Sequence, residues 1–412
     1  MAIKAGTFLH DVHGFVIDRI QTGGVSSLNI PQEKIYELGN YQTVATIFDI
    51  PDLSFDLDSF DVSTEVEAII HGKDPTAAVN GDEYNFNTTF PIDVISPFKA
   101  GNGAFNIVKG LAVPYLTLDT VAYKFGVGNT NASETFTLRG DSIYYIPGSP
   151  YYQQFTTVSG AGHTYTLGHT ALPYVESGNT MHVLSACVKN VSTGAYKRLF
   201  FTTTNDANGY TDSTTTITTV SDWNAQGYTT LHVTYGSTTA ATYNQTVHQG
   251  TSVKPAAVRA KDILCYVGTG GTATSTLIKW SGVQSFDVTR KVNLQNDEEF
   301  GNTKYVSTDY DTADVTGSIT VRAADAASLW TLIEQVSSTS SSEVSGVLST
   351  APLEIMLQVR DPGTGAILKT WNVPDARINV PAIQGKVQTK VDATFPFTSD
   401  SGSLSVFKGP IS

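Results

Sequence analysis

The feature of this sequence that most constrains its fold is an internal duplication at a separation of about 260 residues. The matches keep the same order along the chain and extend through the whole of each copy, which indicates a repeated domain. They comprise Gly24-Val25 with Gly282-Val283, Glu37-Leu38-Gly39-Asn40 with Glu299-Phe300-Gly301-Asn302, Val113-Pro114 with Val373-Pro374, and Thr135-Phe136 with Thr394-Phe395. We therefore predict two tandem copies of one domain.

Both copies contain a strand with one apolar face. Leu53–Asp58 and Val315–Val321 alternate apolar and polar residues, the pattern of a half-buried strand. The two registers agree, so the same face is apolar in each copy. We expect both strands to lie in sheets that cover a hydrophobic core.

A helix is expected after this strand in each copy. In the first copy, Thr64 and Glu67 have the spacing of a capping box, so the helix should begin there and end near Gly72. In the second copy, Asp325 can cap a helix with an apolar stripe at helical spacing. The stripe consists of Leu329, Leu332, Ile333 and Val336.

The segment between the copies has no counterpart in either of them and is rich in Thr, Ser, Asn and Tyr. Its alternating runs at 181–188, 198–201 and 229–235 predict strands of a small β-sandwich, with a hairpin turn at 190–194. We therefore predict a mostly β chain with two tandem β-sandwich or barrel domains, each with a flanking α-helix, and an inserted β-sandwich-like domain. The expected domains are 1–146, 147–260 and 261–412.

Composition agrees with this fold class and opposes some functions. Apolar residues make up 40% of the chain and charged residues 15%, with 35 glycines, as expected for half-buried strands joined by tight turns. The formal net charge of −13 leaves no surplus of Lys and Arg for binding phosphates, which opposes a nucleic-acid reader. No apolar run is long enough for a signal peptide or a membrane span, so we expect no membrane anchor.

Side chains that often bind metals or cofactors do not form a convincing site. Cys187 and Cys265 are far apart and have no metal-ligand spacing, so we expect two buried thiols. His10 and His13 lie in a segment that is expected to be extended or irregular, with no third ligand implied. The glycine-rich run 268–271 lacks the Lys-Ser/Thr of a phosphate loop and fits a hairpin turn.

Catalytic groups are equally hard to find. The cluster Asp309, Asp311 and Asp314 is partly repeated at Asp49 and Asp52, which fits a repeated structural role better than a glycosidase pair. No nucleophile elbow is present. We predict that the protein is not an enzyme and carries no cofactor or metal.

The order of the elements, the phrase Gly-Val-Gln-Ser-Phe-Asp-Val at 282–288 and the phrase Tyr36-Glu37-Leu38-Gly39-Asn40 resemble those of phage tail tube proteins. The likeness covers both copies, about two thirds of the chain. The duplication is similar to a variant in which one siphophage subunit holds two tube-type domains. The resemblance implies that three chains form a pseudo-hexameric ring, that strands of each domain join a closed inner barrel, and that rings stack into a tube through which DNA passes.

The same resemblance implies where the protein acts and with what. Made in the host cytoplasm, it would end in the virion tail as homotrimeric rings that stack on one another. Its other partners would be the tape measure, terminator and baseplate components of the tail, with DNA present only in transit. Ring closure also has a physical motive, because it pairs the edges that an isolated half-buried sheet leaves open.

Two loops are candidates for contacts between stacked rings. Residues 31–41 and 289–305 mix charged and apolar side chains, and connections of this length usually have a function. An ordinary solvated hairpin tip is the alternative. The candidate side chains are Glu33, Lys34, Tyr36, Lys291, Glu298 and Phe300.

The lining of a DNA conduit should be acidic or neutral, because such a surface withholds the cations that would bind phosphates. Asp56 and Asp58, on the polar face of the predicted strand, are the candidates in the first copy, and Ser318 and Thr320 are their neutral equivalents in the second. An exposed outer strand face is the alternative.

Two other functions remain open from the sequence. The inserted domain contains aromatic residues that would suit a host-surface glycan-binding module, although they equally suit the core of a small sandwich. These aromatics are Tyr151, Tyr152, Trp223 and Tyr228. Alternatively, the chain would form a baseplate or tail-terminator ring, because these parts of a tail reuse the same domain.

Overall fold

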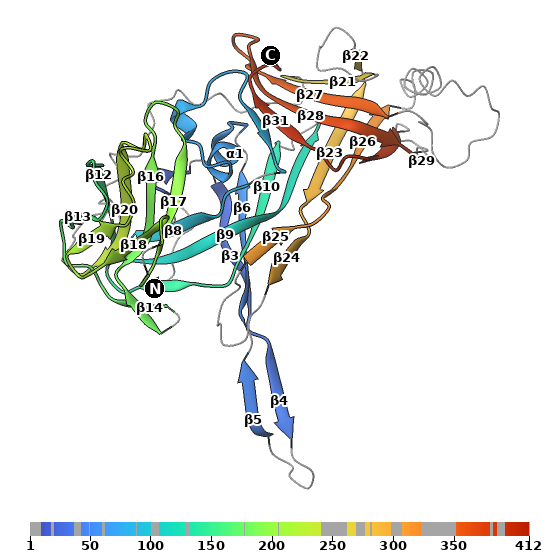
Figure 1. The fold of residues 1–412 in the computed structure, drawn as a ribbon. Coiled ribbons are helices and arrows are strands. Elements are labelled where there is room, and N and C mark those ends of the chain that lie inside the picture. The colour runs from blue at the N-terminus through green and yellow to red at the C-terminus, as the bar shows by residue number, and fades with distance from the viewer. Residues whose placement is uncertain are drawn as a thin grey trace.

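The computed structural model is mostly β, as predicted (Figure 1). It describes residues 10–17, 20–36, 43–48, 50–59, 62–87, 89–99, 107–127, 132–176, 178–204, 206–239, 262–268, 277–280, 282–297, 307–322, 352–379, 382–384 and 392–411.

A continuous antiparallel sheet built from both halves of the chain forms the centre of the molecule. Its first four strands are β3 (Ile20–Asn29), β6 (Asp52–Ser59), β10 (Ser133–Gly140) and the C-terminal half of β9 (Ile107–Gly126). The sheet continues through β23 (Val283–Lys291), β26 (Asp314–Arg322), β30 (Asp392–Ser399) and β29 (Ala382–Gln384). These eight strands are called the main sheet below. Pairing of β9 with β23 joins its two halves.

The two halves of the main sheet pair in corresponding registers. In each half, a threonine near the start of the third strand lies opposite an alanine of the fourth strand. On its other side, the same threonine lies opposite a residue of the second strand that occupies the same place in both halves. These pairs are Thr135 with Ala122 and Asp58 in the first half, and Thr394 with Ala382 and Thr320 in the second. The order of the strands and their residue-level pairing are therefore the same in both halves.

A second sheet in each half also repeats the strand order. In the first half the order is β2 (Phe15–Val16), β1 (Asp11–Val12), β8 (Ile92–Lys99), the N-terminal half of β9, and β11 (Tyr144–Ile146). In the second half it is β22 (Leu277–Trp280), β21 (Ile263–Gly268), β27 (Leu353–Arg360), β28 (Ile367–Ile378) and β31 (Ser405–Lys408). The short strand β7 (Glu83–Asn85) of the first half pairs with β31, so the halves also meet here.

Strand register corrects one of the sequence matches. Gly24 lies opposite Asp56 of β6, whereas Asp287, not Gly282, lies opposite Ser318 of β26. The sequence match is therefore displaced by five residues from the pairing of the strands. A match of Gly-Val alone carries little information, and register shifts within β3 and β23 change the count of residues along each strand.

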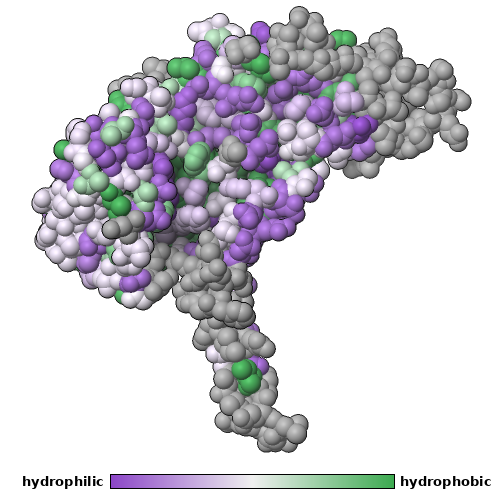
Figure 2. Space-filling view, in the orientation of Figure 1, coloured by the Kyte–Doolittle hydropathy of each residue, from purple (hydrophilic) through white to green (hydrophobic). Residues whose placement is uncertain are grey.

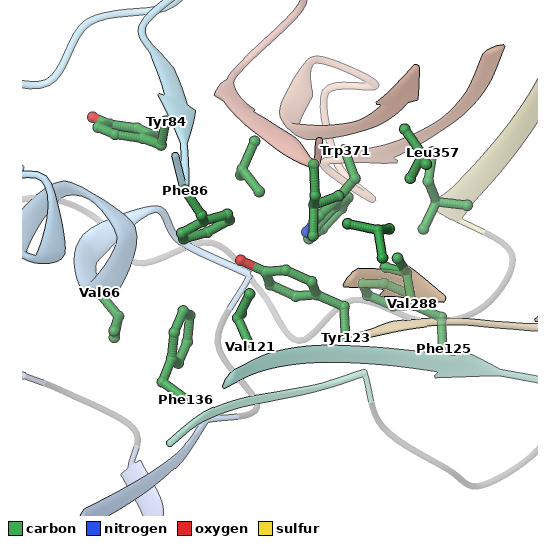
Figure 3. Packing of buried hydrophobic residues seen from close by; sticks show 14 of the residues in the cluster. Val66, Tyr84, Phe86, Val121, Tyr123, Phe125, Phe136, Val288, Leu357 and Trp371 are labelled. Carbon is green, nitrogen blue, oxygen red and sulfur yellow. The ribbon is translucent and has the colours of Figure 1, made fainter. Parts of the chain in front are cut away.

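One hydrophobic core extends beneath both halves. Along β6 the residues alternate between buried and half-buried, with Leu53, Phe55 and Leu57 on the core side. Tyr123 and Phe125 of β9 pack against Trp371 of β28, with ring centroids 5.5 and 4.9 Å apart (Figure 3). Because these rings come from different halves, the two halves cannot separate without exposing the core.

The predicted first helix is present as α1 (Glu65–Ile70), and the chain turns at Gly72 with φ of +65°. The expected capping box is wrong, because Thr64 makes no side-chain capping hydrogen bond. The side chain of Glu67 is fully buried and binds Lys369 instead. A short 3-10 helix, Pro75–Ala77, follows. The helix predicted after Asp325 lies outside the described residues. Among the helices that the structure describes, none is long and apolar enough to cross a membrane.

The insert contains a seven-stranded sheet with its own core, on one side of the main sheet (Figure 1, green). The strand order is β12 (Ser149–Thr156), β20 (Thr230–Ser237), β16 (Val183–Lys189), β17 (Tyr196–Phe201), β18 (Gly209–Asp212), β19 (Thr216–Thr219) and β13 (His163–Thr166). β14 (Tyr174–Glu176) and β15 (Asn179–Met181) form a separate hairpin. The predicted hairpin at 190–194 is confirmed, because it connects β16 to β17.

A long hairpin, called the arm below, projects from one end of the main sheet (Figure 1). It consists of β4 (Gln32–Tyr36) and β5 (Thr43–Phe48), which follow β3 and precede β6 along the chain. In the second half, β24 (Leu294–Asp297) and β25 (Ser307–Tyr310) form the corresponding hairpin between β23 and β26. Both hairpins leave the same end of the sheet, where Asn29 pairs with Asp52 and Lys291 with Asp314.

Candidate assembly surfaces

The polar face of the main sheet carries all four residues that were predicted to line a conduit. Asp56 and Asp58 are half-buried on β6, opposite to the core, and Ser318 and Thr320 occupy the same face of β26. Asp58 accepts a hydrogen bond from the Thr135 hydroxyl at 2.7 Å. Cross-strand hydrogen bonds of this kind hold the short side chains close to the sheet.

Charges on the polar face are of both signs, with an excess of acids. The acidic side chains are Asp52, Asp56, Asp58, Asp287, Asp314 and Asp392, and the basic ones are Lys124, Arg139, Lys291 and Arg322. Arg139 is already paired with Asp52 and Asp119, at 3.3 and 3.4 Å. The face therefore offers no excess of cations to a phosphate backbone.

The arm carries the first set of loop candidates. Glu33, Lys34 and Tyr36 lie in β4, and Lys34 is exposed. Next to it, Ile35 is 39% exposed, and Figure 2 shows a small hydrophobic patch on the arm. Residues 32–36 of the predicted loop at 31–41 thus form a strand, and Lys34 and Ile35 present a charged and an apolar side chain to the outside.

The second set of loop candidates is only partly described. Lys291 is the last residue of β23 and pairs with Asp314 and Thr120, so it lies in the main sheet and not in the hairpin. Glu298 and Phe300 lie outside the described residues. The described strands of this hairpin, β24 and β25, are mostly exposed or half-buried.

Two of the four candidate aromatic residues of the insert are buried and two are half-buried. Tyr152 and Trp223 are buried, at 3% and 2% exposure, and Tyr151 and Tyr228 are half-buried and pack against the core of the insert. Trp223 and Tyr228 contact each other edge to face, with centroids 5.7 Å apart. These positions correspond to the core-filling alternative.

The insert is joined to the main body through a buried ion pair. Asp93 of β8 is fully buried and accepts from Arg198 Nε of β17 at 2.7 Å and from Ser185 Oγ of β16 at 2.9 Å. A further contact connects Lys189 with Asp74. The insert is therefore held by directed polar contacts from two of its strands.

His10 and His13 lie close to the β1–β2 hairpin and contact different side chains. His13 lies in the turn of the β1–β2 hairpin and His10 directly before it, and both are buried. His10 Nδ1 is 2.9 Å from Ser96 Oγ, and the His13 ring lies against Tyr196. Burial lowers the pKa of both histidines to about 4. Among the residues that the structure describes, no group of three His, Cys, Asp or Glu side chains could hold a metal ion.

The two cysteines are buried and free, as expected. Cys187 lies in β16 of the insert and Cys265 in β21 of the second half. Burial raises the pKa of the Cys265 thiol to about 12 and also raises that of Cys187. Neither thiol is therefore ready to react at neutral pH.

A buried charge cluster that sequence reasoning missed joins the two halves. Lys369 of β28 is fully buried, and its Nζ lies 2.5 Å from Glu67 Oε1 and 2.8 Å from Glu134 Oε1. The hydroxyl of Tyr123 donates to Glu67 at 2.9 Å. Burial alone would lower the pKa of Lys369, but the two carboxylates outweigh it and raise this pKa. The only signal in the sequence was a glutamate within the apolar stretch Val66–Ile70.

Comparisons with known proteins find similarity only at the level of solved structures. No protein-family model matches the sequence, and no curated protein matches it. One similar chain comes from the sixfold-symmetrised cryo-EM structure of the anti-feeding prophage baseplate. It is 10% identical to this protein with a TM-score of 0.28, and the match covers 38% of this chain and 98% of the baseplate chain. A second similar chain comes from the cryo-EM structure of the tube-terminating cap of the anti-feeding prophage. It is 13% identical with a TM-score of 0.28, and the match covers 36% of this chain and 93% of the cap chain.

Proposed function

We propose that this chain is a structural subunit of a phage-type tail and that three copies form each ring of a stacked tail tube. The observation that carries the proposal is the main sheet, whose two halves have the same strand order and register. A repeating sheet can be continued by further copies of the same chain. When the rotation between neighbours closes, the sheet becomes a ring without open edges.

The proposed number of chains follows from the two halves. Each half would occupy one sixth of the ring, so three chains close it with pseudo-sixfold symmetry. Contacts between chains would be heterologous, since the first half of one chain meets the second half of the next. The internal β9–β23 pairing supports this arrangement because it already joins a first half to a second half.

The arm and the polar face have distinct roles in this proposal. The arm, which extends beyond the end of the main sheet, would reach the next ring of the stack. The polar face would line the conduit, where its excess of acids keeps DNA in transit from binding. Terminator, tape measure and baseplate proteins would be the remaining partners in the virion tail.

The experiment that tests the proposal is electron microscopy of the purified protein, with subunits counted in each ring. We expect rings of three chains and stacked tubes. A chain that stays monomeric at high concentration would contradict the proposal, and rings of six chains would contradict the trimer alone. Copy number in the particle separates a tube protein, present in many rings, from a baseplate or terminator ring.

A further inference from the structure

We propose that β3 of one chain pairs with β29 of a neighbouring copy, in the register that β9 and β23 already use within one chain. The proposal rests on the proposed function, because it requires copies of the chain to join edge to edge. It specifies which edges meet and which residues lie opposite each other.

The internal junction provides the template. β9 and β23 pair antiparallel without a register shift, from Gly126 opposite Ser285 to Thr120 opposite Lys291. Side chains pack across it as well, because Tyr123 and Val288 lie opposite each other and are both fully buried. A junction of this kind therefore has both ladder hydrogen bonds and core packing.

β3 is the first-half counterpart of β23. Each pairs with the second strand of its own half, and each has a register shift near its start, at Ile20–Thr22 in β3 and at Val283–Ser285 in β23. On its other side β23 pairs with β9, whereas β3 pairs with β6 alone among the described strands. The outer edge of β3 is thus the position where a fourth strand of another copy fits.

β29 is the second-half counterpart of the C-terminal part of β9. Ala382 pairs with Thr394 as Ala122 pairs with Thr135, and the next two pairs of each ladder also correspond. In the part of the chain that the structure describes, β29 pairs with β30 alone. Its other edge has no partner among the described strands and is the position where a first strand of another copy would pair.

The sequence of β3 also favours a paired edge. Edge strands that remain unpaired normally carry a lysine, another charge or a proline that blocks association. The ten residues of β3, Ile20–Asn29, include none of these. Register shifts can also blunt an edge. The shift of β3 at Ile20–Thr22 corresponds to that of β23, which does not prevent the pairing of β23 with β9, whereas the shift at Val25–Ser27 has no counterpart in β23.

Transfer of the internal register gives the contacts between chains. Val288 lies opposite Tyr123, so its counterpart Val25 should lie opposite Ile383 of the neighbour. By the same rule Ser27 should lie opposite Ala382, with Ser26 as the extra residue of the register shift between Val25 and Ser27.

Disulfide trapping tests this register. Residues directly opposite each other in antiparallel strands have Cα atoms about 4.5–5.5 Å apart, within the range of a disulfide. We expect Ser27→Cys with Ala382→Cys to give, after oxidation with diamide, a covalent series on a non-reducing gel that ends at three chains. Dithiothreitol should return it to the monomer. Native Cys187 and Cys265 are buried and add little background.

The matched control is Ser27→Cys with Gln384→Cys, which keeps the same strand and face but moves one cysteine two residues along. We expect at least about tenfold less cross-linked product than from the opposed pair, because the Cα separation then exceeds the disulfide range. Val25→Cys with Ile383→Cys is a second opposed pair, for the case in which the first fails to fold.

Electron microscopy of the same samples separates the two proposals. Rings that cross-link through the control pair would overturn the register, and rings that cross-link through neither opposed pair would overturn the choice of edges. Absence of rings from the unsubstituted protein would overturn the proposed function itself. Rings with cross-links at both opposed pairs and not at the control support the inference.

Discussion

Lys369 connects the two halves of the chain through a buried charge cluster. It pairs with both Glu67 and Glu134 in a site where all three side chains are buried. Such a cluster is costly to assemble, because three charged groups lose their hydration, but it is costlier still to break. The two glutamates of the cluster lie in α1 and β10 of the first half, and the lysine lies in β28 of the second.

We expect Lys369→Met to lower the free energy of unfolding by about 3–5 kcal/mol, since it leaves two buried carboxylates without a cation. Urea unfolding followed by circular dichroism measures this change. Arg377→Met is the matched control on the same strand, because its pair with Asp400 is exposed, and it should cost about 0–1 kcal/mol. Equal losses in the two variants would contradict the role given to Lys369.

Asp11 should give the protein a characteristic dependence on pH. Burial raises the pKa of this carboxyl from 3.8 to about 7, although the Gly14 N–H, which donates to it at 2.7 Å, works against the shift. The native state therefore holds a proton that the unfolded chain has released. This contribution to stability is fully present below pH 4 and is lost as the pH rises to 7.

Asp11→Asn should therefore gain stability relative to the unsubstituted protein as the pH rises. We expect the difference in unfolding free energy to grow by about 1.4 kcal/mol per pH unit between pH 4 and 7 and then to stay constant. His10 and His13 titrate in both proteins, so their opposite contribution cancels in the difference. A difference that does not change with pH would show that Asp11 is charged in the native state.

Sequence reasoning is weakest at this scale. The spacing of Thr64 and Glu67 correctly predicted the start of a helix, but the same glutamate serves a lysine some three hundred residues further along the chain. Local spacing cannot reveal a partner of this kind. Likewise, Tyr152 and Trp223 have aromatic rings of the kind that stack on sugars, and only their burial in the structure identifies them as core residues.

At the scale of elements, the arm is separate from the hydrophobic core. The core clusters contain no described residue of β4 or β5. The sequence of the arm mixes charged and apolar residues, and this mixture predicted a functional loop at 31–41. The strand pairing of Gln32–Tyr36 with Thr43–Phe48 could not be foreseen, because β propensity is low at the charged positions and pairing depends on the partner strand.

Replacement of residues 31–48 by a short Gly-Ser turn tests the role of the arm. We expect the melting temperature to change by less than about 2 °C, since the core clusters include none of the arm residues that the structure describes. Single rings should still form, but stacked tubes should be lost, as seen by electron microscopy. Lys34→Ala, which removes one exposed charge and leaves the hairpin, is the control and should retain tubes. Tubes of normal length without the arm would exclude it from stacking.

At the scale of the whole molecule, the insert is part of the folded body. A small core cluster lies across the boundary, with Ile95, Ala112 and Ile146 from the body and Tyr174, Met181 and Leu184 from the insert. The buried ion pair of Asp93 with Arg198 lies at the same boundary. The sequence predicted an insertion, but its lack of any match to either copy gave no information about how it docks.

Removal of the insert should therefore destabilise the body. Ser149 and Ser237 pair at the ends of β12 and β20, so a Gly-Gly link can replace residues 150–236 without strain. We expect a lower urea midpoint and increased binding of an apolar dye, because Ile95 and Ile146 lose their cover. Val175→Ser, at a side chain that is 70% exposed, is the control and should leave both unchanged. An unchanged midpoint after replacement would make the insert a removable decoration.

The duplication was the most productive prediction at this scale, since it anticipated two sets of strands with one order. The duplication itself carries no information on which strands join the two sets, because β9 and β23 are not equivalent positions of the repeat. The division of the chain into three domains at 146 and 260 remains a prediction.

The direction in which the arm leaves the sheet has a mechanical consequence. Because β3 leads into β4 and β5 leads into β6, a pull on the arm acts along the lengths of β3 and β6. The hydrogen bonds between β6 and β10 lie across that direction, so they carry the load together, in shear. A hairpin that left the sheet sideways would be peeled away one bond at a time. The molecule is therefore built to resist tension along its strands.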